Sequence, residues 1–413
     1  MEQGRKPPSW HRAYWLLLTV GFVSCLAAVA LAVVRTPRIL LVVNDPPESE
    51  SGATGGGAPA AEGASLPAPA HPVAMNAADR AAYDAKLLAI ANLPPPKPAA
   101  RAALAASSGT VRAATGSATT GTAVASATGA AVDTTAPPKP QLWPVKAAYP
   151  DAGALLPFNR IVAYYGNFYS TQMGVLGEYP EDQVIRMLAS TSAMWAAADP
   201  STPVIPAIDY IAVSAQASAG TDGTYRLRMP SNQIDKAIDM ANQLHGIVFL
   251  DIQVGLSTVE REIPPLAAYL SMPNVELSLD PEFAMHNGAR PGTVIGSMDA
   301  KDINWAAQYL ADLVRKNNLP PKILVVHRFT EPMVTNARAI TPLPEVQIVM
   351  DMDGFGPPAQ KLRTYKDFII PEPVQFTGFK LFYKNDIRVP GSHLMTPQEL
   401  LRLSPQPSYI QYQ

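Results

Sequence analysis

The stretch "GIVFLDIQVGLSTVEREIPPLAAYLSMPNVELSLD", residues 246–280, decides the fold of this chain. It holds two apolar runs of strand length, 246–253 and 275–280, and between them a segment of helix-like composition, 257–270. Both runs are almost continuously hydrophobic, which is typical of parallel strands covered by helices. The stretch therefore predicts a strand–helix–strand unit with parallel strands.

The same alternation extends from Phe158 to the end of the chain. Six further runs have strand character: 160–166, 203–213, 322–329, 346–353, 376–383 and 408–412. The other helix candidates are 180–195, 231–244, 299–317, 331–340, 358–368 and 396–403, the last with a capping-box pattern of Thr396 and Glu399. Eight strands and seven helices in roughly 255 residues predict an α/β fold, a (β/α)8 TIM-type barrel. An open doubly wound sheet is the alternative, but a glycine-rich turn after the first strand is missing.

The N-terminal region predicts membrane attachment. Residues 13–34, "AYWLLLTVGFVSCLAAVALAVV", carry no charge and are long enough to span a bilayer as a helix. Basic residues are slightly more frequent before this segment than after it, which favours a cytoplasmic N-terminus, 1–12, and an exported remainder. A cleaved signal peptide and a lipoprotein modified at Cys25 are the alternatives.

A low-complexity tether is expected between the membrane segment and the barrel domain, 144–413. Residues 35–143 are rich in Ala, Pro, Gly, Ser and Thr, and such a composition buries too little apolar surface to fold. One island, 76–93, contains good helix formers and has two interpretations. It is either a helix lying on a neighbouring surface or a nascent helix within the linker.

Overall composition excludes several classes of function. The 32 basic and 34 acidic residues form no basic cluster, so a nucleic-acid partner is excluded. The single cysteine, Cys25, lies in the apolar segment, so neither a disulfide framework nor a cysteine-based metal site is available. No cofactor or resident metal is expected, and the oligomeric state stays open.

Polar residues at the ends of the strand-like runs are the candidate site residues, because barrels of this class keep their active sites at the C-terminal ends of the strands. The candidates for acid–base chemistry are Asp251, Asp280, Glu282 and Asp351. The candidates for substrate binding are Tyr164, Tyr165, Asn167, Gln253, His327, Asp353, Lys380 and Tyr383. Side chains alternate along a strand, so residues two apart, such as Asp280 and Glu282, are expected to face the same mouth.

Some of these acids also have structural interpretations. An aspartate at a strand end is often a turn or N-cap residue, and we favour that interpretation for Asp209 and Asp353. His327 is interpreted as a hydrogen-bonded core histidine, because no second histidine lies at a metal-ligand spacing.

Asp251 and Asp280 follow runs too apolar for a solvated turn, so each needs a partner. We expect Lys380, Arg328 or Tyr164 to fill this role.

Long segments after three strands, 166–180, 214–230 and 283–298, indicate a cleft on the same face of the barrel. Their aromatic side chains either offer flat surfaces to sugar rings or pack the loops. These side chains are Tyr165, Phe168, Tyr169, Tyr179 and Tyr225.

The segment "SLDPEF", 278–283, carries a resemblance to a known family. An exported barrel with acids at its strand ends resembles the glycoside hydrolases, and Asp280-Pro281-Glu282 is similar to the Asp-x-Glu motif of barrel-type lysozymes. The resemblance implies that Glu282 is the proton donor and that Asp280 stabilises charge on the reacting sugar. The chain departs from the larger retaining glycosidases, because its seventh strand offers Lys380 instead of a carboxylate. It also lacks the chitinase-like D-x-x-D-x-D-x-E string.

Residues 160–413 also resemble uncharacterised secreted or lipoprotein-type bacterial barrel proteins, through blocks such as "FLDIQ", "LVVHRFT" and "MDGFG". Three functions stay open. We favour a membrane-tethered hydrolase of cell-wall or extracellular polysaccharide such as peptidoglycan over a non-catalytic glycan-binding or scaffolding barrel. A metal-dependent hydrolase using Asp251, Asp280, His327 and Asp351 is the third. Asp–Lys pairs across the mouth would favour a structural role.

Overall fold

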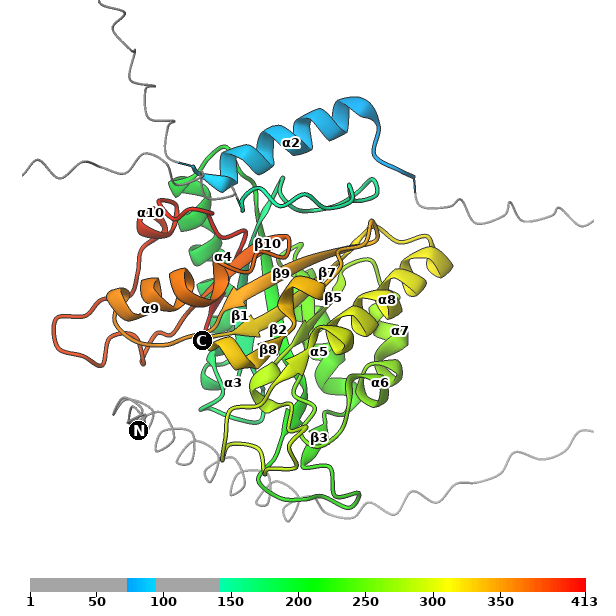
Figure 1. The fold of residues 1–413 in the computed structure, drawn as a ribbon. Coiled ribbons are helices and arrows are strands. Elements are labelled where there is room, and N and C mark those ends of the chain that lie inside the picture. Colours follow the sequence, from blue (N-terminus) through cyan, green and yellow to red (C-terminus); the bar gives the residue numbers. More distant parts are fainter. Residues whose placement is uncertain (1–72, 94–141) are drawn as a thin grey trace, which may run out of the picture. The chain divides into compact units, whose positions relative to one another are not determined.

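The computed structural model describes residues 73–93 and 142–413 (Figure 1). The predicted membrane segment, 13–34, and most of the predicted linker lie outside these residues. Within the two described ranges, no helix has both the length and the apolar character needed to cross a bilayer.

Eight parallel strands form a closed barrel, and all eight coincide with the predicted runs to within a few residues. Going round the barrel, they are β1 (Arg160–Gly166), β2 (Val204–Ala215), β4 (Ile247–Ile252), β5 (Val275–Leu279), β7 (Lys322–Arg328), β9 (Val346–Met352), β10 (Phe376–Leu381) and β11 (Tyr409–Tyr412). Because β1 pairs with both β2 and β11, the sheet has no free edge there, and the alternative of an open sheet is wrong. The closed parallel barrel is consistent with the predicted TIM-type class.

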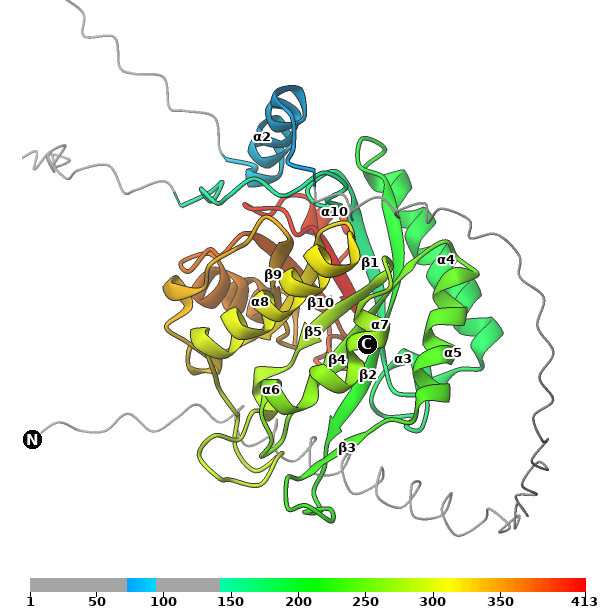
Figure 2. The same ribbon diagram turned by 90° about the vertical axis from the view of Figure 1, so that its right-hand side faces the viewer.

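Helices follow most of the strands and pack on the outer face of the barrel (Figures 1 and 2). They are α3 (Val175–Glu178), α4 (Glu181–Ala198), α5 (Ser231–Asn242), α6 (Val259–Glu262), α7 (Ala267–Leu270), α8 (Ala300–Asn317), α9 (Pro358–Thr364) and α10 (Pro397–Leu400). The predicted capping box of Thr396 and Glu399 is present at α10. A second one, formed by Asp299 and Asp302, begins α8.

Three predicted helices are interrupted. Segment 257–270 is split into α6, the 3-10 turn η1 (Pro264–Leu266) and α7, because prolines lack the N–H that an α-helix needs. Segment 331–340 is not an α-helix: η3 (Glu331–Met333) and η4 (Ala337–Ala339) flank β8 (Val334–Thr335), which pairs with β6 (Met298–Asp299). The backbone of Asn336, with φ of 56°, breaks any helix there. Segment 358–368 continues from α9 into the π-helical turn η5 (Tyr365–Ile369).

A hairpin that the sequence did not predict extends from the C-terminal end of β2. Strand β3 (Arg226–Arg228) returns antiparallel to the last residues of β2. Arg226 and Arg228 both pair with Glu262, at 2.8 and 2.7 Å, and Glu262 is fully buried. These ion pairs fix the hairpin to α6, next to the mouth of the barrel.

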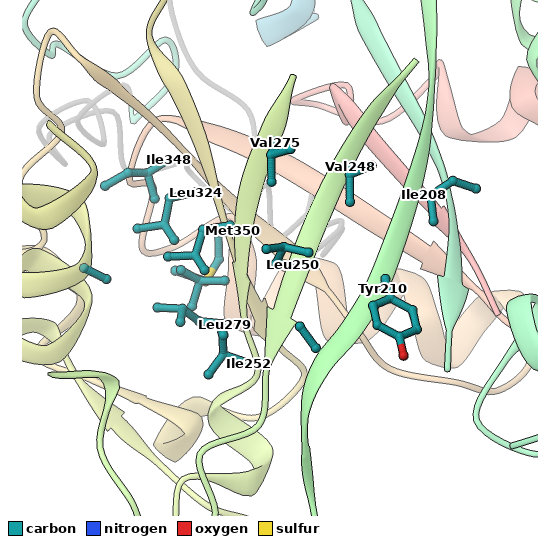
Figure 3. Close-up of a cluster of buried hydrophobic side chains, with 14 of the residues drawn as sticks. Ile208, Tyr210, Val248, Leu250, Ile252, Val275, Leu279, Leu324, Ile348 and Met350 are labelled. Atoms are coloured by element: carbon teal, nitrogen blue, oxygen red, sulfur yellow. The ribbon is translucent and has the colours of Figure 1, made fainter. Parts of the chain in front are cut away.

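The main hydrophobic core lies between the barrel and its outer helices. Figure 3 shows part of it on the outward-facing side of the strands, including Ile208, Val248, Leu250, Leu324 and Met350. These side chains alternate with inward-facing ones, as the period of two requires. The strands are therefore apolar on both faces near their middle, which explains their continuous hydrophobic sequence.

The island 76–93 is a helix that lies on the barrel, the first of its two interpretations. Helix α2 (Ala77–Ala91) begins at Asn76, whose side chain accepts the N–H of Asp79. Its Tyr83 is buried in a cluster with barrel-interior side chains such as Ile161 and Phe249. The N–H of Gln406, just before β11, donates to the carbonyl of Ile90 at 2.7 Å. Helix α2 therefore covers the N-terminal end of the barrel, and the barrel unit includes residues within the predicted linker.

Candidate functional site

The inward-facing side chains of the barrel change from apolar to polar along the strands. Near the N-terminal end the interior is filled by side chains such as Ile161, Phe249 and Val325. At or just beyond the C-terminal end of the strands, buried charged side chains gather: Asp251, Asp280, His327, Asp351, Asp353 and Lys380. The buried Asp209 faces the same interior from within β2. Strands far apart in sequence deliver these groups to one layer.

A cavity of about 390 Å³ opens above this layer. Its floor includes Tyr165, Gln253, Asp280, Glu282, Asp353 and Lys380. Loops after β1, β2, β5, β9 and β10 supply its walls. The volume falls in the range of small-molecule sites, about 300–1,000 Å³. The mouth of the barrel therefore brings seven of the twelve predicted site residues, these six and Tyr383, together around one space.

Asp280 is held at the end of β5 by neutral hydrogen-bond donors. Pro281 begins the 3-10 turn η2 (Pro281–Phe283), and the N–H of Glu282 donates to Asp280 Oδ1 at 3.2 Å. Gln253 Nε2 lies 3.3 Å from Asp280 Oδ2 and 3.2 Å from the hydroxyl of Tyr165. A hydrogen bond orients the Gln253 side chain in turn: its Oε1 accepts the N–H of Ala215 at 3.1 Å. Asp280 and Glu282 are thus aimed into the cavity by a stiff turn.

The carboxyl group of Asp280 retains its proton unusually well. Burial raises the pKa of Asp280 to about 7, the negative charge of Asp251 adds to the shift, and the positive charge of His327 opposes it. A group that titrates near neutral pH can both hold and release a proton at physiological pH. Asp280 can therefore act as an acid toward a molecule in the cavity.

Lys380 is a charged ammonium in the same cavity. Its Nζ lies 3.2 Å from Asp353 Oδ1 and 3.9 Å from the centre of the Tyr165 ring. Burial lowers the pKa of Lys380, but Asp353 and the other nearby carboxylates outweigh it, so that the pKa lies above its usual value. A lysine that keeps its proton is not a nucleophile, so what Lys380 presents to the cavity is a positive charge.

His327 lies beneath the cavity and is fully buried. Its Nδ1 is 3.1 Å from Asp351 Oδ2, and its Nε2 is 3.4 Å from Asp251 Oδ2 and 3.1 Å from Ser278 Oγ. This is the hydrogen-bonded core histidine that the sequence favoured. Among the described residues, no group of three or more His, Cys, Asp or Glu side chains is arranged to hold a metal ion.

The two remaining acid candidates, Asp251 and Asp351, are displaced from the expected position. Both are fully buried and neither lines the cavity. Asp251 pairs with His327, not with any of its expected partners, because His327 on β7 projects into the barrel at the level of Asp251 on β4. They therefore lie beneath the residues that line the cavity.

Tyr164, Asn167 and Arg328 lie outside the cavity, which corrects their expected placement. Tyr164 is adjacent to Tyr165 in a strand, so it faces the helices, where its hydroxyl is 2.8 Å from Thr191 Oγ1. It also contacts the hydroxyl of Tyr383, which lines the cavity, at 3.0 Å. Arg328 faces outward too, and pairs with Glu372.

Asn167 has a structural position in the turn after β1. Its side-chain amide donates to the carbonyl of Ile211 at 3.0 Å, and its Oδ1 accepts the N–H of Tyr169 at 2.9 Å. These bonds hold the loop after β1 against β2.

Asp209 and Asp353 are neither turn nor N-cap residues, contrary to the favoured interpretation. Asp209 lies within β2 and faces the barrel interior, where its Oδ2 accepts the hydroxyl of Tyr409 at 2.6 Å and Gln411 Nε2 at 2.7 Å. Asp353 pairs with Lys380 across the mouth. Sequence could not distinguish these roles, because each partner comes from another strand, 27 residues away for Lys380 and 200 or more for Tyr409 and Gln411.

Few of the predicted loop aromatics reach the cavity. Of the five, Tyr165 lines it, whereas Phe168 stacks on Tyr210 with ring centres 4.8 Å apart. Three aromatic side chains that were not predicted do line it: Phe283, Phe355 and Phe382. Phe382 follows Lys380 by two residues, so strand alternation would have identified it.

The buried Asp209 predicts a measurable pH dependence of stability. Burial and the charge of Asp251 raise the pKa of Asp209 to about 7, above the unfolded value of about 3.9. The folded state therefore binds more protons than the unfolded state between these values, and this group's contribution to stability is lost as pH rises toward 7. Asp209→Asn keeps an oxygen acceptor and cannot ionise. We expect it to gain on the order of 1–3 kcal/mol at pH 8 over the wild type.

Urea unfolding at pH 5 and pH 8 measures this difference. The control is Asp239→Asn, on the exposed face of α5, which should leave both values unchanged. A gain of equal size at both pH values would contradict the prediction.

The fold and the mouth define a closed parallel α/β barrel with an acid-lined cavity at the carboxyl ends of its strands. No family model matches the chain, and no curated protein matches it. It is similar to solved structures at 10–12% identity and TM-scores of 0.30–0.31.

Three such structures are a GH18 chitinase from Pseudoalteromonas aurantia, the HPPK-DHPS of Plasmodium falciparum with pteroate, and a ruminal GH26 endo-beta-1,4-mannanase. The matches cover 62%, 62% and 61% of this chain, and 93%, 44% and 58% of those chains, respectively.

Proposed function

We propose that this barrel hydrolyses glycosidic bonds in a cell-wall or extracellular polysaccharide. The observation that carries the proposal is the pairing of Asp280 and Glu282 in one cavity, where the pKa of Asp280 is raised to about 7. Glycoside hydrolysis uses two carboxyl groups, one to protonate the leaving oxygen and one to act as base, nucleophile or charge stabiliser. The cavity holds two carboxyl groups, those of Asp280 and Glu282, for these two roles.

We assign the proton to Asp280 and the partner role to Glu282, the reverse of the assignment implied by barrel-type lysozymes. The reason is that burial and Asp251 favour the protonated form of Asp280. Tyr165 and Phe382 offer apolar surface for a sugar ring, and Lys380 offers a fixed charge for its polar groups. Asp251 and Asp351 act from below and do not touch the substrate.

A non-catalytic glycan-binding barrel is the second candidate. The ion pair of Lys380 and Asp353 across the mouth favours it, because such a pair occupies groups that could otherwise bind or react. This candidate predicts binding without turnover.

An assay of the full-length chain in mild detergent separates the two candidates. We expect new reducing ends when the protein is incubated with purified peptidoglycan or with one member of a polysaccharide panel. Co-sedimentation with an insoluble glycan and no new reducing ends would support the binding barrel instead. Absence of both binding and cleavage across the panel would overturn both candidates.

The proposed substrate requires an exported barrel. This location rests on the apolar segment 13–34, which we propose to be an uncleaved membrane anchor. Protease added to intact cells should then digest the barrel, and its protection there would contradict the location.

A further inference from the structure

The layer beneath the cavity holds more acids than bases. Five buried carboxyl groups gather there: Asp209, Asp251, Asp280, Asp351 and Asp353. Only two basic side chains, His327 and Lys380, form ion pairs with them among the described residues. Buried carboxylates without a positive partner are costly, so protons must neutralise part of this charge.

The surroundings of His327 favour its charged form, because three carboxyl groups lie within 3.5 Å of its ring nitrogens. Nδ1 faces Asp351 at 3.1 Å and Asp353 at 3.5 Å, and Nε2 faces Asp251 at 3.4 Å. A neutral imidazole has one nitrogen without hydrogen, which would point its lone pair at a carboxylate. An imidazolium presents positive charge to the carboxylates on both sides, and its Nε2 also lies 3.1 Å from the hydroxyl of Ser278.

The positive charges are distributed unevenly over the five acids. His327 contacts Asp251 and Asp351, and Lys380 contacts Asp353. Asp280 receives only neutral donors, from Gln253 and from the backbone of Glu282. Three acids therefore have a cationic partner, whereas Asp280, which borders the cavity, has none.

Asp209 is the other acid without a cationic contact, since its donors are Tyr409 and Gln411. It lies in the interior and does not line the cavity. Of the two acids left to carry protons, only Asp280 can pass one to a bound molecule.

We infer that His327 is a positioning residue for the proton of Asp280. As a permanent imidazolium, His327 keeps Asp251 and Asp351 ionised. The negative charge of Asp251 then keeps the proton on Asp280. This inference deepens the proposed function, since Asp280 is the proton donor of that proposal. This charge relation, the effect of His327 and Asp251 on the proton of Asp280, needs no bound substrate. It can therefore be tested whether or not the barrel cleaves a glycan.

The groups facing His327 come from every neighbouring part of the layer. They are Asp251 of β4, Ser278 of β5, Asp351 and Asp353 at β9, Lys380 of β10 and the Tyr165 ring of β1, whose centroid lies 6.0 Å away. Burial lowers the pKa of His327, but the carboxylates outweigh it and hold the pKa well above the usual range. Lys380 opposes the charge of His327 without overcoming this balance.

The first measurement is a pH titration of 15N-labelled histidines in the full-length chain. The sequence has six histidines, and His327 should keep both ring nitrogens protonated to a pH well above the ordinary histidine range. His327→Gln assigns the signal. A His327 resonance that titrates in the ordinary range overturns the inference.

The second measurement follows the protonated carboxyl of Asp280 by difference infrared spectroscopy, with Asp280→Asn removing its band. In the wild type the band should disappear with a midpoint near pH 7. In His327→Gln the carboxylate of Asp251 loses its cationic partner, so less of its negative charge should act on Asp280 and the midpoint should fall by about one pH unit. Asp251→Asn preserves volume and should cause the same fall, even if His327→Gln does not fold.

His327→Lys should restore the wild-type midpoint, because it returns a positive charge beside Asp251. A midpoint that rises in His327→Gln would mean that the imidazolium acts on Asp280 directly, and it would overturn the inference. An unchanged midpoint in both His327→Gln and Asp251→Asn would also overturn the inference. Absence of glycan cleavage in the presence of these shifts would reject the proposed function and leave the charge relation intact.

Discussion

Replacing Asp280 with Asn is expected to lower the rate of glycan cleavage by about two to four orders of magnitude, the usual contribution of a general acid. Asparagine keeps the shape of the side chain and an oxygen that can accept the N–H of Glu282. It has no proton to give to the leaving oxygen. The wild-type rate should also fall as pH rises through about 7, because the pKa of Asp280 is raised to that value by burial and by Asp251.

Initial rates of reducing-end release from the susceptible polysaccharide, taken between pH 5 and pH 9, measure both effects. Asp239→Asn on α5 is the control and should match the wild type at every pH. If Asp280→Asn retains at least a tenth of the wild-type rate while Glu282→Gln loses almost all of it, Glu282 is the donor. Our assignment of the two roles would then be wrong.

Replacing Tyr83 with Ala is expected to destabilise the barrel by about 3–5 kcal/mol, as for other large aromatic side chains removed from a core. Tyr83 is 3% exposed and packs edge-to-face against Tyr149 and Phe158, with ring centres 5.8 and 6.3 Å away. Its burial raises the pKa of Tyr83 to about 12, with a hydrogen bond to Gln375 opposing the shift. The alanine leaves a void at the N-terminal end of the barrel.

Denaturant unfolding of the full-length chain, followed by circular dichroism, measures this loss of unfolding free energy. Leu88, on the same helix and 59% exposed, provides the matched control. Leu88→Ala should change stability by no more than about 0.5 kcal/mol. Equal stability of Tyr83→Ala and the wild type would mean that α2 does not contribute to the barrel in solution.

Most of the fold was predictable because the strands are buried on both faces. A run such as 246–253 stays hydrophobic at every position up to Asp251, and that pattern identifies a parallel strand without knowledge of its neighbours. Helices were less predictable where local breakers act. Pro264 and Pro265 divide one predicted helix, and the left-handed Asn336 prevents another.

The position of α2 shows a different limit. Its alanine-rich sequence supports either a docked helix or a nascent one, since its intrinsic helix propensity is the same in both cases. The docked form depends on Tyr83 meeting a cluster built from residues more than sixty positions away. No local pattern encodes that contact.

The candidate site, too, was predictable from the sequence only in part. Strand order placed Asp280, Glu282, Gln253 and Lys380 at the mouth, because each lies at or just beyond the carboxyl end of a strand. Side-chain alternation excludes Tyr164, which is adjacent to the inward-facing Tyr165 and therefore faces the helices.

Sequence order and period thus establish that the chain forms a closed parallel barrel and that acids stand at its carboxyl end. They do not establish which acid is charged. That depends on which counterion each acid meets: His327 reaches Asp251 and Asp351, Lys380 reaches Asp353, and Asp280 is left with neutral donors. Electrostatic energy depends on distance in space, and closure of the barrel brings together side chains as far apart in sequence as Asp209 and Gln411, which are 202 residues apart.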